Sequence, residues 1–140
     1  MYLLDTNVLS ELTRPRPDLA VIRRLFSTAP SALFASEMTR YELRYGAALH
    51  PRAEEIWQKV VQEILPLPLW LAIDEPISLA AGRLRGELRR AGKPIEVQDA
   101  FLAATALAHD LVLVTRNVRH FDNVHGLTVE NWFGEATGGG

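Results

Sequence analysis

Three acidic residues, Asp5, Glu42 and Asp99, have the type and placement to build a reactive site together. Asp5 follows the apolar run at residues 2–4, which is typical of a buried strand. Glu42 lies beside the apolar face of a predicted helix, and Asp99 falls in the first turn of the most apolar helix of the chain. Loops at the carboxyl ends of parallel strands gather at one crevice, so we expect the three carboxylates to meet there.

Each acid also has an ordinary structural explanation. Asp5 suits the cap of a turn, and Asp99 suits the first turn of a helix, where a carboxylate complements the helix dipole. Glu42 could extend its carboxylate from the edge of the apolar face to water. Only the joint placement of the three acids therefore favours a functional site.

Three carboxylates in one crevice require compensation. At about 5 Å and an effective dielectric constant of about 20, each pair repels by roughly 3 kcal/mol. Protonation of one acid is one solution, and a hard divalent cation is a fuller one, because Mg²⁺ or Mn²⁺ binds a few carboxylates and keeps open water positions. We expect direct or water-mediated ligation of Mg²⁺ (or Mn²⁺) by the three acids, with Asp5 and Asp99 as metal ligands. Such an ion suits hydrolysis of phosphodiesters.

Polar residues next to these acids could support them. Asn117 follows the apolar run at residues 111–115 by two positions and should face the same crevice as Asp5. A threonine can orient a carboxylate or a water, and an asparagine can hydrogen-bond a metal-bound water. The expected supporting residues are Thr6, Asn7, Glu96 and Thr115. The four histidines show no metal-ligand spacing, so zinc is not expected.

The elements that must position these residues alternate between strand and helix. Short apolar runs predict strands at residues 2–4, 31–35, 111–115 and 127–129, and the proline-containing stretch 64–73 suits an edge. Helical periodicity predicts helices at residues 19–26, 37–49, 52–64 and 97–109, and a further helix begins after Asp74 with Pro76 in its first turn. Met38, Tyr41, Tyr45 and Leu49 are expected to line one side of the 37–49 helix. The pattern predicts a three-layer α/β/α sandwich with a mostly parallel sheet.

Length and composition limit the class of protein. The chain has 140 residues, of which 48% are hydrophobic and 23% charged, and these values fit one globular domain, predicted at 1–134, with a flexible tail at 135–140. The formal net charge of −2 excludes a generally basic nucleic-acid coat, and the absence of cysteine excludes thiol chemistry and disulfides. No signal peptide or membrane-spanning stretch is recognisable, so a cytoplasmic location is predicted.

A basic segment, RLRGELRRAGK at residues 83–93, stands out in this slightly acidic chain. It could bind phosphate groups, or it could be a solvated helix face, the commoner explanation of such runs. Its candidate RNA-binding residues are Arg83, Arg85, Arg89, Arg90 and Lys93.

Four stretches carry a resemblance to a known family: LLDTNVLSEL, the helix EMTRYELRYG, IEVQDAFLAATALAHDLVLVTRN and the closing RHF. Together they resemble the PIN-domain ribonucleases, in the VapC branch of bacterial toxin–antitoxin pairs. The resemblance implies an α/β/α sandwich, Mg²⁺- or Mn²⁺-dependent endoribonuclease activity on RNA, homodimerisation, and inhibition by a cognate antitoxin protein. An antitoxin that enters the acidic crevice should offer arginine or lysine to it.

The resemblance assigns the family's acidic positions to residues of this chain. Asp5 matches the first position, Glu42 the second and Asp99 the third. The fourth, often an aspartate, is Asn117 here, which weakens the case for a second tightly held metal. Glu96 or Asp122 could take its place.

Two other functions remain open at this stage. A strand that ends in Asp-Thr also resembles aspartyl-phosphate enzymes of the haloacid dehalogenase type, although Asn7 stands where their second aspartate would be. The missing fourth acid allows a PIN-like module that binds RNA or protein without cleaving it. The preferred hypothesis is the metal-dependent endoribonuclease toxin, with Asp5, Glu42, Asp99 and Asn117 as its catalytic residues.

Overall fold

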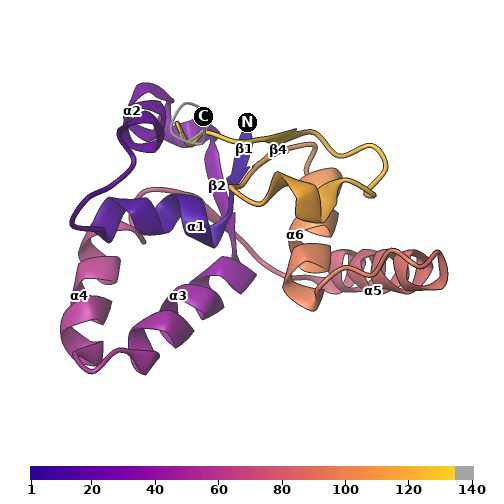
Figure 1. The fold of residues 1–140 in the computed structure, drawn as a ribbon, viewed down its shortest axis with the longest axis horizontal. Coiled ribbons are helices and arrows are strands. Elements are labelled where there is room, and N and C mark those ends of the chain that lie inside the picture. Colours follow the sequence, from indigo (N-terminus) through magenta and orange to yellow (C-terminus); the bar gives the residue numbers. More distant parts are fainter. Residues whose placement is uncertain (135–140) are drawn as a thin grey trace.

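A five-stranded parallel sheet forms the centre of the protein (Figure 1). The computed structural model describes residues 1–134, and the tail predicted at 135–140 lies outside them. The strand order is β3-β2-β1-β4-β5. The strands are β1 (Tyr2–Leu4), β2 (Leu33–Ser36), β3 (Leu69–Leu71), β4 (Val112–Val114) and β5 (Val129–Glu130).

Helices cover both faces of this sheet, which confirms the predicted α/β/α sandwich. The α-helices are α1 (Thr6–Leu9), α2 (Leu19–Ser27), α3 (Glu37–Leu49), α4 (Ala53–Glu63), α5 (Glu75–Arg90) and α6 (Val97–Ala108). Short 3₁₀ helices lie between these elements, at Ser10–Thr13, Pro30–Ala32 and Val118–Phe121. Within residues 1–134, no helix is both long and apolar enough to cross a membrane.

The alternation of side chains along the central strands builds two cores. Leu3 and Leu113 pack with α5 and α6 on one face of the sheet. Leu4 and Val114, the next residues along the same strands, pack with α1 to α4 on the other face. Successive strand side chains point to opposite faces, so two uninterrupted apolar strands demand a helical layer on each side.

Local signals in the sequence set several element boundaries. The Ser36 hydroxyl accepts from the backbone N–H of Met38 and begins α3, and the Asp74 carboxylate accepts from that of Ile77 and begins α5. The proline-containing stretch forms β3 at the edge of the sheet, as predicted, because proline cannot donate to a neighbouring strand.

The structure differs from the sequence-based expectation in three places. The chain turns into α1 directly after Asp5, a helix of four residues that is too short to leave a periodic pattern. The last strand lies at Val129–Glu130, shifted from the expected 127–129. The helix α3 buries a different side from the one predicted: Tyr41 and Tyr45 are exposed, and small residues occupy much of its buried face. Helix α3 buries Thr39, Leu43 and Ala47.

The carboxyl ends of the two central strands bring the first site residues together. Strands β1 and β4 pair in parallel, with Leu4 opposite Val114. The backbone N–H of Asp5 donates to the Val114 carbonyl at 2.9 Å. Asp5 and Thr115, the residues that follow these strands, therefore leave the sheet side by side.

Candidate active site

An acidic cleft of about 290 Å³ opens at this end of the sheet. It collects side chains from the β1–α1 junction, from α3, from the start of α6 and from the segment after β4. The lining residues are Asp5, Thr6, Asn7, Glu42, Glu96, Gln98, Asp99, Asn117 and His120. The three acids singled out from the sequence, far apart along the chain, thus share one cleft.

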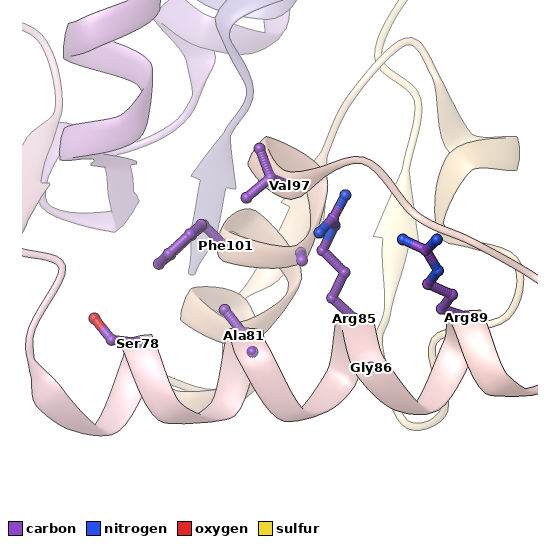
Figure 2. A pocket seen from close by; sticks show the side chains of 9 residues that line it. Ser78, Ala81, Arg85, Gly86, Arg89, Val97 and Phe101 are labelled. Carbon is purple, nitrogen blue, oxygen red and sulfur yellow. The ribbon is translucent and has the colours of Figure 1, made fainter.

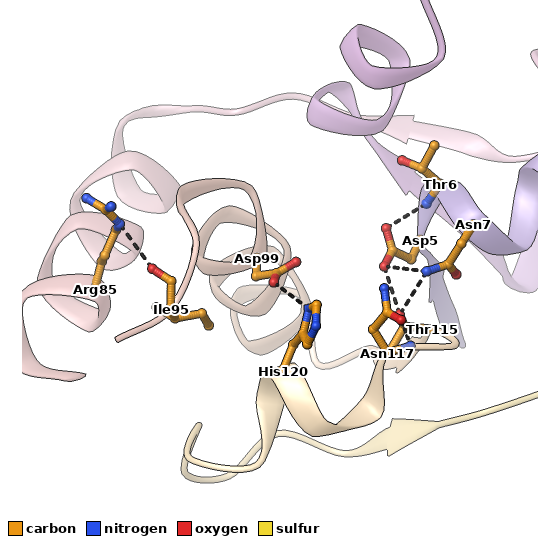
Figure 3. A network of polar contacts seen from close by, with 9 residues as sticks. All are labelled: Asp5, Thr6, Asn7, Arg85, Ile95, Asp99, Thr115, Asn117 and His120. Carbon is orange, nitrogen blue, oxygen red and sulfur yellow. Dashed lines mark hydrogen bonds and ion pairs between the residues drawn. The ribbon is translucent and has the colours of Figure 1, made fainter. Parts of the chain in front are cut away.

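Asp5 lies at the centre of a hydrogen-bond network (Figure 3). Its Oδ1 accepts from the backbone N–H of Thr6 at 2.7 Å, and its Oδ2 accepts from the Thr115 hydroxyl at 2.8 Å. The Asn7 amide is also directed at Oδ2, at 3.4 Å. The side chain of Asp5 therefore has a fixed orientation. Its role as the cap of α1 and its place in the cleft are compatible, because different lone pairs serve each.

Burial governs the protonation of Asp5. The residue is only 7% exposed. Burial raises the pKa of its carboxyl from 3.8 to about 6, against the hydrogen bonds from Thr115 and Thr6, which lower it. The negative charges of Glu42 and Asp99 raise this pKa further. The cleft thus holds more negative charge than its surroundings neutralise.

Glu42 reaches the cleft from α3 and is hydrogen-bonded to the first residue of α1. Its Oε1 accepts from the Thr6 hydroxyl at 2.8 Å, while the backbone N–H of Thr6 donates to Asp5. Thr6 therefore holds two carboxylates at a fixed separation. The half-buried Glu42 does not extend away to water as an isolated helical glutamate would.

Asp99 enters the cleft from the first turn of α6 and is 8% exposed. Its Oδ2 lies 3.0 Å from His120 Nδ1. Burial raises the pKa of Asp99, as does the nearby charge of Glu96, whereas contact with His120 lowers it. Asp99 is therefore a second carboxylate whose burial favours the protonated form unless a cation is near.

The segment after β4 supplies the neutral side of the cleft. The Thr115 hydroxyl, fully buried, accepts from the backbone N–H of Asn117 at 3.1 Å while it donates to Asp5. The Asn7 side chain accepts from the backbone N–H of Arg116 at 3.2 Å. These bonds fix the turn that directs Asn117 into the cleft. Of the two possible substitutes for a fourth acid, Glu96 lines the cleft, whereas Asp122 is exposed and is not among its lining residues.

The donor set limits how a metal could bind. Within residues 1–134, no group of three histidine, aspartate or glutamate side chains is placed so that it could hold a metal ion. Two buried carboxylates, Asp5 and Asp99, face a cleft with room for water. Mg²⁺ characteristically binds through one or two carboxylates and keeps several waters. The residues present fit a hydrated Mg²⁺ or Mn²⁺ and do not fit a dedicated all-protein site.

Two lining residues, Gln98 and His120, were missed by the sequence reasoning. The histidines show no metal-ligand spacing in the sequence, so spacing alone gives no reason to place His120 at the site. The 3₁₀ helix at Val118–Phe121 folds it back onto Asp99. The available signal was its place in the RHF stretch of the family resemblance.

The predicted basic residues all lie outside the acidic cleft. Arg85 and Arg89 line hollows beside it, between α5 and the segment that leads into α6. The other three lie on α5 or just after it and are exposed, and they are Arg83, Arg90 and Lys93.

Fold and cleft place the chain among α/β proteins that gather carboxylates at the end of a parallel sheet. The model of the PIN domain family matches residues 2–127, and the chain belongs to this family. It is 36% identical over 126 residues to the toxin FitB of Neisseria gonorrhoeae, which covers 86% of this chain and 91% of that protein. It is 32% identical over 131 residues to the tRNA(fMet)-specific endonuclease VapC of Salmonella typhimurium, with 94% and 97% covered.

Solved structures agree with this assignment. The crystal structure of FitAcB from Neisseria gonorrhoeae superposes with a TM-score of 0.84 at 35% identity, and it covers 94% of this chain and 98% of that one. DNA-bound VapBC from Salmonella typhimurium superposes with a TM-score of 0.80 at 31% identity, with 94% and 97% covered. Membership of the PIN domain family removes the motif argument for a haloacid dehalogenase-type enzyme, which rested on the Asp-Thr strand end alone.

Proposed function

We propose that this protein is a divalent-metal-dependent endoribonuclease that acts as the toxin of a toxin–antitoxin pair. The observation that carries the proposal is the convergence of buried Asp5 and Asp99 with Glu42 on one cleft. Relatives that are named toxin, ribonuclease and tRNA endonuclease support it, since they match nearly the full length of the chain.

Asp5 and Asp99 would hold the metal, Mg²⁺ or Mn²⁺. When bound, such an ion lowers the pKa of an attacking water and neutralises charge that develops on the phosphoryl group. Thr115 and Thr6 keep the Asp5 carboxylate in one orientation, with their donors on opposite oxygens. His120 does the same for Asp99 through Nδ1. These contacts orient both carboxylates before substrate arrives.

Glu42 and Asn117 would act on the substrate side of the cleft. Glu42 is placed by Thr6 so that its carboxylate can accept a proton from water. Asn117 provides an amide that can hydrogen-bond water or phosphate without adding negative charge. Because the position is neutral, one metal is a better fit than two, and Glu96 is the acid available for a second.

The antitoxin of such a pair would be a protein with cationic side chains for the cleft. Asp5, Glu42, Glu96 and Asp99 give the cleft a negative potential, which attracts arginine or lysine. Similar solved structures include VapBC from Salmonella typhimurium, VapBC-1 from Haemophilus influenzae and a toxin–antitoxin complex from Klebsiella pneumoniae. A homodimer is proposed on the resemblance and on the exposed aromatic side chains of α3.

The direct test is cleavage of RNA by the purified chain, free of antitoxin, with Mg²⁺ or Mn²⁺. Structured and unstructured RNAs should be compared with Asp5→Asn and Asp99→Asn variants. The exposed Asp122→Asn variant is the matched control for the loss of a carboxylate. We expect cleavage by the wild type and the control only. Equal cleavage by all four proteins would indicate a contaminating nuclease, and binding without cleavage by the wild type would favour a non-catalytic RNA-binding module.

A further inference from the structure

The helix α5 presents its arginines on two opposite sides. Residues three, four and seven positions apart lie on one face of a helix, so Arg85 and Arg89 share a face, and Arg83 and Arg90 share the other. In Figure 2, Arg85 extends from α5 toward the first turn of α6, and Arg89 extends from the same side of α5 toward the segment that leads into α6. Arg83, on the far side, pairs with Glu87 at 2.8 Å.

Neighbouring hollows with shared lining residues lie between the Arg85–Arg89 face and the acidic cleft. Arg85 lines a hollow whose other walls include Glu96, Asp99 and His120. The same three side chains line the acidic cleft. Figure 3 shows this succession, from Arg85 past Asp99 to Asp5. A ligand that lies in these hollows would therefore lie next to the carboxylates of the cleft.

The charges of this face are available to a ligand. Arg85 donates through Nε to the Ile95 carbonyl at 3.2 Å, which anchors its guanidinium beside the cleft. Within residues 1–134, neither Arg85 nor Arg89 has a carboxylate partner. Arginine binds phosphate well because its planar group offers several donors in a fixed geometry.

Two glycines on the same face leave open space in the hollow beside the arginines. Gly82 and Gly86 alternate with the two arginines, and a Cβ at either position would meet nothing within 4 Å. Packing inside this chain therefore does not require glycine there, although glycine is unfavourable in a helix interior. Glycine at these positions leaves room for a ligand to approach the helix closely. The neighbouring Phe101 presents part of its ring to the same hollow, and such rings bind unpaired bases.

We infer that the Arg85–Arg89 face of α5 binds the phosphate backbone of single-stranded RNA and leads it into the acidic cleft. The inference rests on the proposed function and adds the path of the substrate. A polyanion is repelled by the carboxylates, so cations beside the cleft must hold it. The two arginines lie about 6 Å apart along the helix axis, a separation that suits neighbouring phosphates of an extended strand.

The test compares two double variants that carry the same charge. The first variant, called the groove pair, combines Arg85→Gln with Arg89→Gln and alters the Arg85–Arg89 face. The second, called the opposite pair, combines Arg83→Gln with Arg90→Gln and alters the other face of the same helix. Affinity for a fluorescent single-stranded RNA is measured by anisotropy in EDTA, over a series of salt concentrations. Each lost phosphate contact should reduce the slope of log affinity against log salt by about 0.7. We expect the groove pair to lose about 1.4 in slope and about tenfold in affinity at low salt, and the opposite pair much less.

Two further measurements distinguish RNA binding by Arg85 from a purely structural role of this residue. Arg89 forms no side-chain hydrogen bond within the described residues, so Arg89→Gln alone should reduce the slope by about 0.7. Mn²⁺ affinity of the groove pair should equal that of the wild type, because Asp5 and Asp99 are untouched. Loss of Mn²⁺ binding with an unchanged salt slope would mean that Arg85 only positions the segment before α6, and would overturn the inference.

Other results would also overturn it. Equal weakening by both pairs would show a diffuse effect of net charge. Unchanged RNA binding together with altered sedimentation of the groove pair would identify the face as an interface between copies of the chain. If the wild type cleaves RNA and the groove pair binds as tightly as the wild type, the inference fails while the proposed function stands. If the wild type neither binds nor cleaves RNA, both fail.

Discussion

Replacing Asp5 with asparagine should stabilise the metal-free protein and remove its response to metal. Burial raises the pKa of Asp5 from 3.8 to about 6, so the ionised carboxylate is less stable in the folded protein than in the unfolded chain. Each tenfold change in the proton dissociation constant corresponds to about 1.4 kcal/mol, which gives about 3 kcal/mol for this residue. Asparagine removes the charge and keeps the shape.

The pH dependence follows from the same shift. A carboxyl whose pKa is raised by folding binds its proton more tightly in the folded state, so stability falls as pH rises from about 4 through about 6. Above that range the full penalty is present, and below it the penalty disappears. The variant should therefore exceed the wild type in stability at about pH 7.5 and match it at about pH 4. The value of about 3 kcal/mol is an upper limit, because an amide has one acceptor oxygen and cannot accept from both the Thr6 backbone N–H and the Thr115 hydroxyl.

The assay is urea unfolding in EDTA across this pH range, with the exposed Asp122→Asn as control. Added Mg²⁺ should raise the midpoint of the wild type and leave that of Asp5→Asn unchanged, since a ligand stabilises only the state that binds it. A variant less stable than the wild type at neutral pH in EDTA would refute the reasoning. So would a difference that does not vary with pH.

Three further predictions follow from the same contacts. Thr115→Val removes the hydroxyl that donates to Asp5 at 2.8 Å and should lower RNA cleavage about 10- to 100-fold, as measured by initial rates; undiminished rates would show that this bond does not orient the carboxylate. Mg²⁺ affinity, measured by calorimetry, should fall about tenfold per pH unit below about pH 6 as Asp5 takes up a proton; equal affinities at about pH 5 and about pH 7 would contradict this ligand assignment. Gly86→Ala should raise the free energy of unfolding by about 0.5–1 kcal/mol and weaken RNA binding, and a more stable variant with undiminished RNA affinity would mean that nothing approaches the glycine.

Much of the fold could be predicted because apolar runs and caps are local signals. Asp74 and Ser36 begin helices by accepting from backbone N–H groups two or three residues ahead, and this requires no tertiary information. The buried side of α3 could not be predicted in this way. Large side chains such as Tyr41 suggested one face, but the helix packs closely through small residues and leaves the aromatic rings exposed.

The residues of the site likewise divide into those that the sequence predicted and those that only the structure revealed. The strand ends predicted the meeting of Asp5 with Asn117, since adjacent parallel strands leave the sheet at one edge. His120 was beyond this reasoning, because its contact with Asp99 depends on how a 3₁₀ helix folds back across 21 residues of chain. Which face of the basic segment lies beside the cleft also needed the structure, because only the position of α6 shows which arginines have a neighbour.

Cleavage of RNA requires negative charge to bind the metal and positive charge to bind the phosphates, and the acidic cleft and the Arg85–Arg89 face supply these separately. Buried carboxylates bind a cation tightly because burial makes their uncompensated charge unfavourable, which is what the raised pKa of Asp5 and the raised pKa of Asp99 express. The same negative charge repels a phosphodiester backbone, and a single bound cation neutralises only part of it. Cations on the protein are therefore needed close to the cleft but outside it, where they cannot pair with the metal-binding carboxylates. Arg85, held by a backbone carbonyl instead of by Asp99, occupies such a position.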